Sequence, residues 1–291
     1  MTRLQFVKMH GLGNDYVYVD GYDASVQDPG AVSRQVSDRH RGVGSDGLIL
    51  LLPPVDGGDV RMRMFNADGS EAEMCGNGVR CLARLAIERG RATGPDLTIE
   101  TGAGHLRVQC GSAPADPRGS WDVSVDMGRP IREPAAVPVL TADLAPAGDG
   151  AWWVKPSDDT EALACRFVSM GNPHAVAFVD AVADVDLGLI GPQVERHAAF
   201  PRRINVHVVT VHSPQHVEMR TWERGAGMTE ACGTGACAVA VAAIDAGLTD
   251  RRVRTTLPGG DLDIHWPDDG AAVVMRGPAT HVFEGHVVVD G

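Results

Sequence analysis

Glu230-Ala231-Cys232-Gly233-Thr234-Gly235-Ala236-Cys237 is the stretch that decides the fold, because a similar run occurs earlier, as Glu73-Met74-Cys75-Gly76-Asn77-Gly78-Val79-Arg80-Cys81. A shift of 157 positions (232 − 75) superposes the first cysteine of each run and the two glycines that follow it. Further matches extend downstream: Ala240 on Ala83, Ala243 on Ala86, Ile244 on Ile87 and Gly247 on Gly90. A repeat at a fixed offset predicts a chain of two related halves.

The repeat unit has the pattern of a strand, a glycine-rich turn and a helix. Apolar residues follow each cysteine at helical spacing, and Gly90 and Gly247 stand where a C-terminal glycine cap is expected. The second helix is apolar nearly all round, which predicts burial on every side. The apolar positions are Val79, Leu82, Ala83, Ala86 and Ile87 in the first half, and Ala236, Val239, Ala240, Ala243 and Ile244 in the second.

A thiol at the start of a helix carries a chemical expectation. Unpaired backbone N–H groups and the positive end of the helix dipole stabilise negative charge. We therefore expect the thiolates of Cys75 and Cys232 to form more readily than a usual cysteine pKa of about 8.5 allows. The same N–H groups predict a carboxylate-binding site.

Composition narrows the class of protein. A length of 291 residues suggests two domains, and a net charge of −12 argues against nucleic-acid or anionic-membrane partners. Arg3, Lys8 and His10 interrupt the apolar residues of the first 20, so no signal peptide is expected. We expect a cytoplasmic protein, in which six cysteines do not predict a disulfide framework.

The remaining segments predict an α+β fold. We expect two pseudo-symmetric domains, each a mixed or antiparallel sheet wrapped around a central buried helix, with an active-site cleft between them. The N-terminal domain would span 1–118 plus a C-terminal strand at about 277–291, and the C-terminal domain 119–276. Expected strands are 4–7 and 16–19 around a turn at 11–15, 48–52, and hairpins at 97–108 and 253–264. A helix should begin at Asp28-Pro29, and 113–119 and 131–150 are candidate linkers.

Each candidate residue also has a structural interpretation. Four asparagines are of a type common in turns and helix caps: Asn14, Asn66, Asn172 and Asn205. His174 is also consistent with a turn residue. Glu223 and Arg224 are consistent with a solvent-exposed charge pair. His207, His212 and His216 resemble strand and loop histidines without ligand spacing. Cys81, Cys110, Cys165 and Cys237 are expected in the core. Spacings of six residues from Cys75 to Cys81 and five from Cys232 to Cys237 do not fit a structural zinc site.

Two equivalent cysteine turns suit one reaction in particular. Inversion of a carbon centre requires removal of a proton from one side and delivery of a proton to the other. One cysteine would enter as the thiolate and the other as the thiol, and their roles would exchange with the direction of reaction.

Five motifs, in order along the chain, resemble those of diaminopimelate epimerases. The resemblance runs from about Leu4 to about Phe283. The motifs are Lys8-Met9-His10-Gly11-Leu12-Gly13-Asn14-Asp15, Phe65-Asn66-Ala67-Asp68-Gly69-Ser70, Cys75-Gly76-Asn77-Gly78, Met170-Gly171-Asn172-Pro173-His174, and Glu223-Arg224-Gly225-Ala226-Gly227 followed by Ala231-Cys232-Gly233-Thr234-Gly235.

The resemblance implies interconversion of LL- and meso-diaminopimelate without a cofactor or metal, on the route to lysine and peptidoglycan, by a homodimer. Cys75 would be the base and Cys232 the acid in the LL to meso direction, and His174 and Glu223 would support catalysis. The amides of Gly76-Asn77 and Gly233-Thr234 would hold the carboxylate at the reacting carbon. The remaining substrate contacts would be Asn14, Asn66, Asn172, Asn205, Glu223 and Arg224. Arg224 suits a carboxylate clamp, and Glu223 and the asparagines suit ammonium groups.

Two positions depart from the family pattern. Gly47 stands where many members carry a glutamine that touches the distal end of the substrate, and Met228 replaces a common glutamate. Alternatives therefore stay open: a racemase or epimerase for proline, hydroxyproline or histidine, a thiol hydrolase using Cys75 with His174, or a binding protein without catalysis.

Overall fold

The protein, described here as a computed structural model covering residues 2–116 and 119–290, divides into two compact units. Unit 1 runs to Asp126 and takes up the chain again from Arg276, and unit 2 is Met127–Met275. The predicted domain boundary between 118 and 119, and the middle of the predicted linker 113–119, fall on residues 117–118, outside the described residues.

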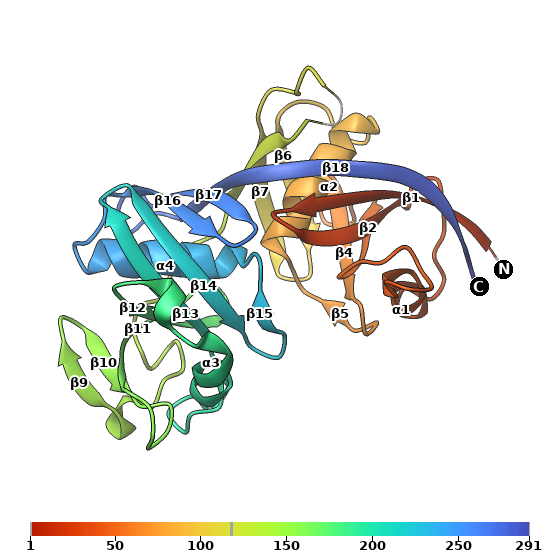
Figure 1. Cartoon of the computed structure of the whole chain (residues 1–291). Coiled ribbons are helices and arrows are strands. Elements are labelled where there is room, and N and C mark those ends of the chain that lie inside the picture. The colour runs from red at the N-terminus through yellow and green to blue at the C-terminus, as the bar shows by residue number, and fades with distance from the viewer. Residues whose placement is uncertain (1, 117–118, 291) are drawn as a thin grey trace. The chain divides into compact units, whose positions relative to one another are not determined.

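Unit 1 is a mixed sheet around one long helix, with a second, short helix. Strand β1 pairs antiparallel with β2 and with β18, whereas β2–β3 and β4–β6 are parallel pairs. Helix α2 contacts β1 to β4 and β6 to β8 (Figure 1). The elements are β1 Thr2–Gly11, β2 Asn14–Asp20, α1 Pro29–Ser37, β3 Gly47–Leu52, β4 Val60–Asn66, β5 Glu71–Ala72, α2 Gly76–Glu88, β6 Asp96–Thr101, β7 Gly104–Cys110, β8 Trp121–Asp126 and β18 Val274–Val289.

Unit 2 repeats this plan. Strands β12 and β13 are parallel, as are β14 and β16. The pairs β9–β10, β10–β11, β11–β12, β13–β14, β14–β15 and β16–β17 are antiparallel. Helix α4 contacts β11, β12, β13, β16 and β17 (Figure 1). The elements are η1 Thr141–Asp143, β9 Ala145–Gly148, β10 Ala151–Val154, β11 Leu163–Ser169, β12 Pro173–Phe178, η2 Val182–Asp184, α3 Leu187–Glu195, β13 Asn205–Ser213, β14 His216–Glu223, β15 Gly227–Thr229, α4 Gly233–Asp245, β16 Arg252–Leu257 and β17 Gly260–His265.

The two long helices begin and end alike, as the repeat predicts. Cys75 and Cys232 are their N-cap residues, both with extended backbone. At the other end Gly90 and Gly247 have φ of 65° and 68°, a left-handed conformation that favours glycine. The N–H of Arg91 donates to the carbonyl of Ala86 over 2.8 Å, and that of Leu248 to Ala243 over 2.9 Å. Both ends are therefore the same glycine-capped motif.

The strand pairings of the two units also show which residues occupy equivalent positions. Tyr16 pairs with Gly47 across β2–β3, and His174 pairs with Asn205 across β12–β13. Ile49 then lies opposite Met64, and His207 lies opposite Thr221. Tyr16, Gly47, Ile49 and Met64 of unit 1 thus correspond to His174, Asn205, His207 and Thr221 of unit 2.

Two expectations about loops are wrong. The turn predicted over 11–15 is only Leu12 and Gly13, since Gly11 pairs with Asn14, and both turn residues have positive φ. The predicted linker 131–150 is part of unit 2, because Val137 and Val139 are buried in its core and Ile131 bridges to Ser169. Its Pro, Ala and Gly content was misleading, since buried valines at alternate positions anchor the segment.

The coarse fold prediction, a mixed-sheet α+β protein with few helices, is confirmed. The predicted strands at 48–52 and in the hairpins 97–108 and 253–264 are present, and Asp28 caps α1 by accepting from the N–H of Ala31 over 2.9 Å. In the part of the chain that is described, no helix has the length and apolar character required to cross a bilayer.

Candidate active site

Cys75 lies among polar groups of unit 1. Its Sγ accepts from the N–H of Gly78 over 3.4 Å, as an N-cap does. As a thiol it donates to Oδ1 of Asn14 at 3.4 Å, and the hydroxyl of Tyr16 points at Sγ from 3.8 Å. Asn14, Tyr16 and the first turn of α2 thus all contact the sulfur of Cys75.

The carboxylate of Asp46 orients Asn14. Its Oδ2 accepts from Nδ2 of Asn14 over 2.8 Å, so Oδ1 of Asn14 is directed at Cys75 and, over 3.4 Å, at Nδ2 of Asn77. Arg39 donates to Asp46 and to Asp15 over 2.9 Å each, and buried Lys8 pairs with Asp15. An ion network thus fixes which end of the Asn14 amide faces the cysteine.

Asn66 and Gly47 lie on the neighbouring strands β4 and β3 of unit 1. Asn66 ends β4, and its Nδ2 donates to the hydroxyl of Ser70 over 3.0 Å. A Cβ at Gly47 would collide with the carbonyl oxygen of Phe65. A side chain at position 47 would therefore require β4 to move away from β3.

Cys232 lies beside a carboxylate in unit 2. It is 4% exposed, and its Sγ lies 3.9 Å from the hydroxyl of Thr234. Burial, and next the negative charge of Glu223, raise the pKa of the Cys232 thiol well above 9.0. Burial also raises the pKa of Glu223, although a 2.6 Å hydrogen bond from Thr229 and a bond with Cys232 oppose this.

The expectation that the helix start lowers the thiol pKa is wrong for Cys232. The dipole of α4 favours a thiolate, but loss of hydration and the adjacent carboxylate both disfavour a second negative charge. Burial and Glu223 therefore outweigh the helix start and favour the thiol form of Cys232.

Asn205 and Glu195 hold the loop that carries Glu223 and Arg224. Oδ1 of Asn205 accepts from the backbone N–H of Arg224 over 2.9 Å, and its Nδ2 donates to the carbonyl of Pro173 over 2.8 Å. Buried Glu195 accepts from the indole of Trp222 over 2.8 Å and from Gly225 over 3.2 Å. Arg224 itself is exposed, and its guanidinium donates to the carbonyl of Arg202 over 2.9 Å.

His174 and His207 form a buried pair that links Asn172 to Thr221. Oδ1 of Asn172 lies 2.9 Å from Nε2 of His174, and Nδ1 of His174 lies 2.8 Å from Nε2 of His207. Nδ1 of His207 lies 3.0 Å from the hydroxyl of Thr221. Burial lowers the pKa of His174 well below 6.5 and that of His207 to about 3, so both rings are neutral at neutral pH.

Sequence reasoning missed several of these partners. His207 was interpreted as an ordinary strand histidine, and Tyr16, Asp46, Thr221 and Glu195 were not considered. A signal existed for His207, because residues two apart share a face of a strand and His207 follows Asn205 by two, as His174 follows Asn172. By contrast Cys81, Cys110, Cys165 and Cys237 are buried, as expected.

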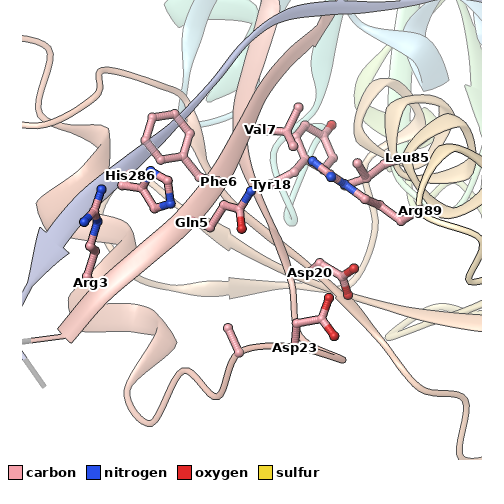
Figure 2. Close-up of a pocket in the computed structure, with 11 residues that line it drawn as sticks. Arg3, Gln5, Phe6, Val7, Tyr18, Asp20, Asp23, Leu85, Arg89 and His286 are labelled. Carbon is pink, nitrogen blue, oxygen red and sulfur yellow. The ribbon is translucent and has the colours of Figure 1, made fainter.

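A surface hollow of about 470 Å³ in unit 1 is separate from these residues (Figure 2). None of the predicted site residues lines it. Its acidic residues, Asp20 and Asp23, both pair with Arg91, and its Arg89 pairs with Glu284 over 2.8 Å. Most of its charges are thus already neutralised by the protein. Over residues 2–116 and 119–290, no group of three or more His, Cys, Asp or Glu side chains could hold a metal ion.

Comparison with known proteins assigns the family. Residues 6–133 and 166–282 match the family model described as diaminopimelate epimerase. The chain belongs to the diaminopimelate epimerase family. A diaminopimelate epimerase of Desulforudis audaxviator is 50% identical over 283 residues, covering 97% of this chain and 98% of that protein. One of Desulfovibrio desulfuricans is 46% identical over 291 residues, covering 98% and 99%.

The fold extends beyond the diaminopimelate epimerase family. A probable proline racemase from Agrobacterium radiobacter, solved with bound carbonate, superposes with a TM-score of 0.69 at 15% identity, covering 99% of this chain and 93% of that one. At this identity the likeness establishes a shared fold only.

Proposed function

We propose that this chain interconverts LL- and meso-diaminopimelate by transferring protons at one α-carbon between Cys75 and Cys232. The observation that carries the proposal is that a member of this family presents a cysteine twice, each time as the N-cap of a buried helix. In the LL to meso direction the Cys75 thiolate takes the α-proton. The carbanion that forms takes the proton of the Cys232 thiol on its other side, which leaves Cys75 as thiol and Cys232 as thiolate.

The surroundings of the two cysteines support these directions. Cys75 has donors aimed at its sulfur, the N–H of Gly78 and the hydroxyl of Tyr16, and both stabilise a thiolate. Cys232 has the carboxylate of Glu223 beside it, which stabilises the protonated thiol. The first cysteine therefore suits a base and the second an acid, with Glu223 as a supporting group.

We assign the substrate contacts by the groups that each residue offers. The first amides of α2 and α4, at Gly76-Asn77 and Gly233-Thr234, would hold the carboxylate next to the reacting carbon and stabilise the charge that develops there. Arg224 would bind the distal carboxylate. Asn14, Asn66, Asn172, Asn205 and Glu223 would complete the contacts to polar groups.

Deuterium incorporation tests the proposal directly. The protein is incubated with LL- and with meso-diaminopimelate in deuterated water, with proline and histidine as control substrates. We expect inversion of LL- or meso-diaminopimelate with deuterium at the α-carbon, and no exchange in the controls. Exchange of proline, or a trapped acyl-enzyme in place of exchange, would refute the proposal.

Action of both thiols on one carbon requires that they can approach each other, and the cleft expected between the domains stays a prediction. A short thiol cross-linker should join Cys75 to Cys232 and be blocked by substrate. Failure to join them, with each cysteine singly labelled, would contradict a shared site. The homodimer and the cytoplasmic location also stay predictions, and sedimentation velocity tests the first.

A further inference from the structure

A row of buried polar side chains runs across three neighbouring strands of unit 2 beneath the second cysteine turn. His174 is on β12, His207 on β13 and Thr221 on β14, and their exposures are 0%, 0% and 3%. A Cβ built on Gly235 would lie 2.5 Å from Cε1 of His207 and 3.0 Å from Sγ of Cys232. The ring of His207 therefore packs directly against the first turn of α4.

The equivalent row of unit 1 is apolar at two of its three positions. Ile49 replaces His207 and Met64 replaces Thr221, and the Cδ1 atom of Ile49 lies 2.6 Å from a Cβ built on Gly78. The same space beneath a cysteine turn is thus filled by hydrocarbon in one half. Burial of a second imidazole and a hydroxyl loses hydration free energy unless both groups make hydrogen bonds. Since the apolar side chains of unit 1 fill the same space, packing alone does not require the polar row of unit 2.

The hydrogen bonds of this row have one consistent direction. Oδ1 of Asn172 can only accept, so Nε2 of His174 carries the proton. In a neutral ring Nδ1 is then an acceptor, so Nε2 of His207 donates to it. By the same reasoning Nδ1 of His207 accepts from the hydroxyl of Thr221. The direction passes from Thr221 through both rings to Asn172.

We propose that His207 and Thr221 are positioning residues. The N–H of His207, whose other ring nitrogen contacts Thr221, donates to Nδ1 of His174 and so favours the His174 form with its proton on Nε2. That proton holds Oδ1 of Asn172, which leaves Nδ2 of Asn172 for the substrate. The inference rests on the proposed function for its substrate, an amino acid with a carboxylate that an amide N–H can bind. It adds a specificity: with Oδ1 held by His174, Asn172 offers N–H donors, which suit a carboxylate.

Four variants separate this role from a purely structural one. His207→Gln keeps an N–H near the place of Nε2, whereas His207→Leu removes it, and Thr221→Val removes only the hydroxyl. The control is Val208→Ala, in the same strand but in the hydrophobic core, which removes buried volume without touching the row. Each is examined without substrate by nitrogen-15 NMR of the histidine rings, which distinguishes protonated from unprotonated ring nitrogens, and by steady-state kinetics with diaminopimelate.

In the wild type we expect protonated Nε2 and unprotonated Nδ1 on both His174 and His207. His207→Gln and Val208→Ala should keep this state of His174 and stay within about threefold of the wild-type kcat/KM. His207→Leu should mix the two ring forms and raise KM about tenfold, the factor expected for one misdirected hydrogen bond to a charged group, with a smaller change in kcat. Thr221→Val should act in the same direction, about threefold.

A proton on Nδ1 of His174 in the wild type would overturn the proposal, as would an unchanged KM in both His207→Leu and Thr221→Val. If His207→Leu fails to fold, Thr221→Val decides the kinetic part. A wild type that does not turn over diaminopimelate would refute the proposed function, while the ring spectra would still decide whether His207 and Thr221 fix His174.

Discussion

The two cysteine turns have similar backbones but different side chains beside the sulfur. Cys75 and Cys232 have φ of −139° and −130°, and each precedes a 13-residue helix that ends in the same glycine cap. The side chains of Asn14 and Tyr16 contact the sulfur of Cys75. Around Cys232 a carboxylate, Glu223, takes the position that Asn66 has under the repeat offset of 157.

The difference teaches that a repeat fixes where two thiols are placed and leaves their chemistry to their neighbours. Each cysteine stands at the start of a helix, so the helix dipole by itself does not make one cysteine an acid and the other a base. Burial and the charge of Glu223 raise the pKa of Cys232 despite that helix. A near-symmetric scaffold can therefore support the two unlike roles that inversion of a carbon centre requires.

Removing either thiol should have the largest effect. Cys75→Ala and Cys232→Ala should each lower kcat by about 10²–10⁴-fold, the contribution of a positioned acid or base. Near-native thermal unfolding would show that the fold is intact, and Cys165→Ala, in the core, should keep activity. Full activity in either active-site variant would show that the turns are not a two-base pair.

Replacing the second glycine of each cysteine turn by alanine should reduce activity by different amounts in the two units. Gly235→Ala would press on the ring of His207 and on Sγ of Cys232, so we expect a loss of about 10²-fold in kcat/KM, as for a displaced catalytic group. Gly78→Ala meets the flexible end of Ile49 and lies 3.8 Å from Sγ of Cys75, so its loss should be below about tenfold. Equal losses would contradict the asymmetric packing.

Replacing Glu223 by Gln should reduce the electrostatic difference between the two cysteine turns. The carboxylate raises the pKa of Cys232, so its removal lowers that pKa. In the proposed mechanism, activity from LL to meso requires the Cys232 thiol and is lost as pH rises through the pKa of that thiol. The alkaline limb of the pH profile should therefore move to lower pH. The exposed Glu218, which pairs with His212, supplies the control Glu218→Gln, whose limb should not move. If the alkaline limb does not move in Glu223→Gln, Glu223 is not the cause of the raised pKa of Cys232.

Tyr16→Phe should have the smallest effect. The hydroxyl lies 3.8 Å from Sγ of Cys75, a long contact, while the N–H of Gly78 lies 3.4 Å from the same atom. Loss of the hydroxyl should therefore lower kcat by only about threefold, consistent with a weak neutral hydrogen bond. A loss as large as that of Cys75→Ala would instead make Tyr16 a proton donor or acceptor in the reaction.

Much of the molecule could be predicted from local patterns. The helices after Cys75 and Cys232, their glycine caps and the preceding strands depend on residues close in sequence, so spacing alone identified them. The segment 131–150 was misjudged because its burial depends on Val137 and Val139 reaching a distant core.

The sequence by itself determined the repeat, the family and the candidate cysteines, because these depend on residue order. Only the tertiary structure decided which groups surround each thiol. The groups concerned come from strands and loops that are not adjacent in sequence: Tyr16, Asp46, His207 and Thr221. Their influence depends on burial and on contacts of 2.8 to 3.8 Å. Hydrogen bonds and charge effects act through space, so the residues that tell the two cysteines apart appear only when the chain is folded.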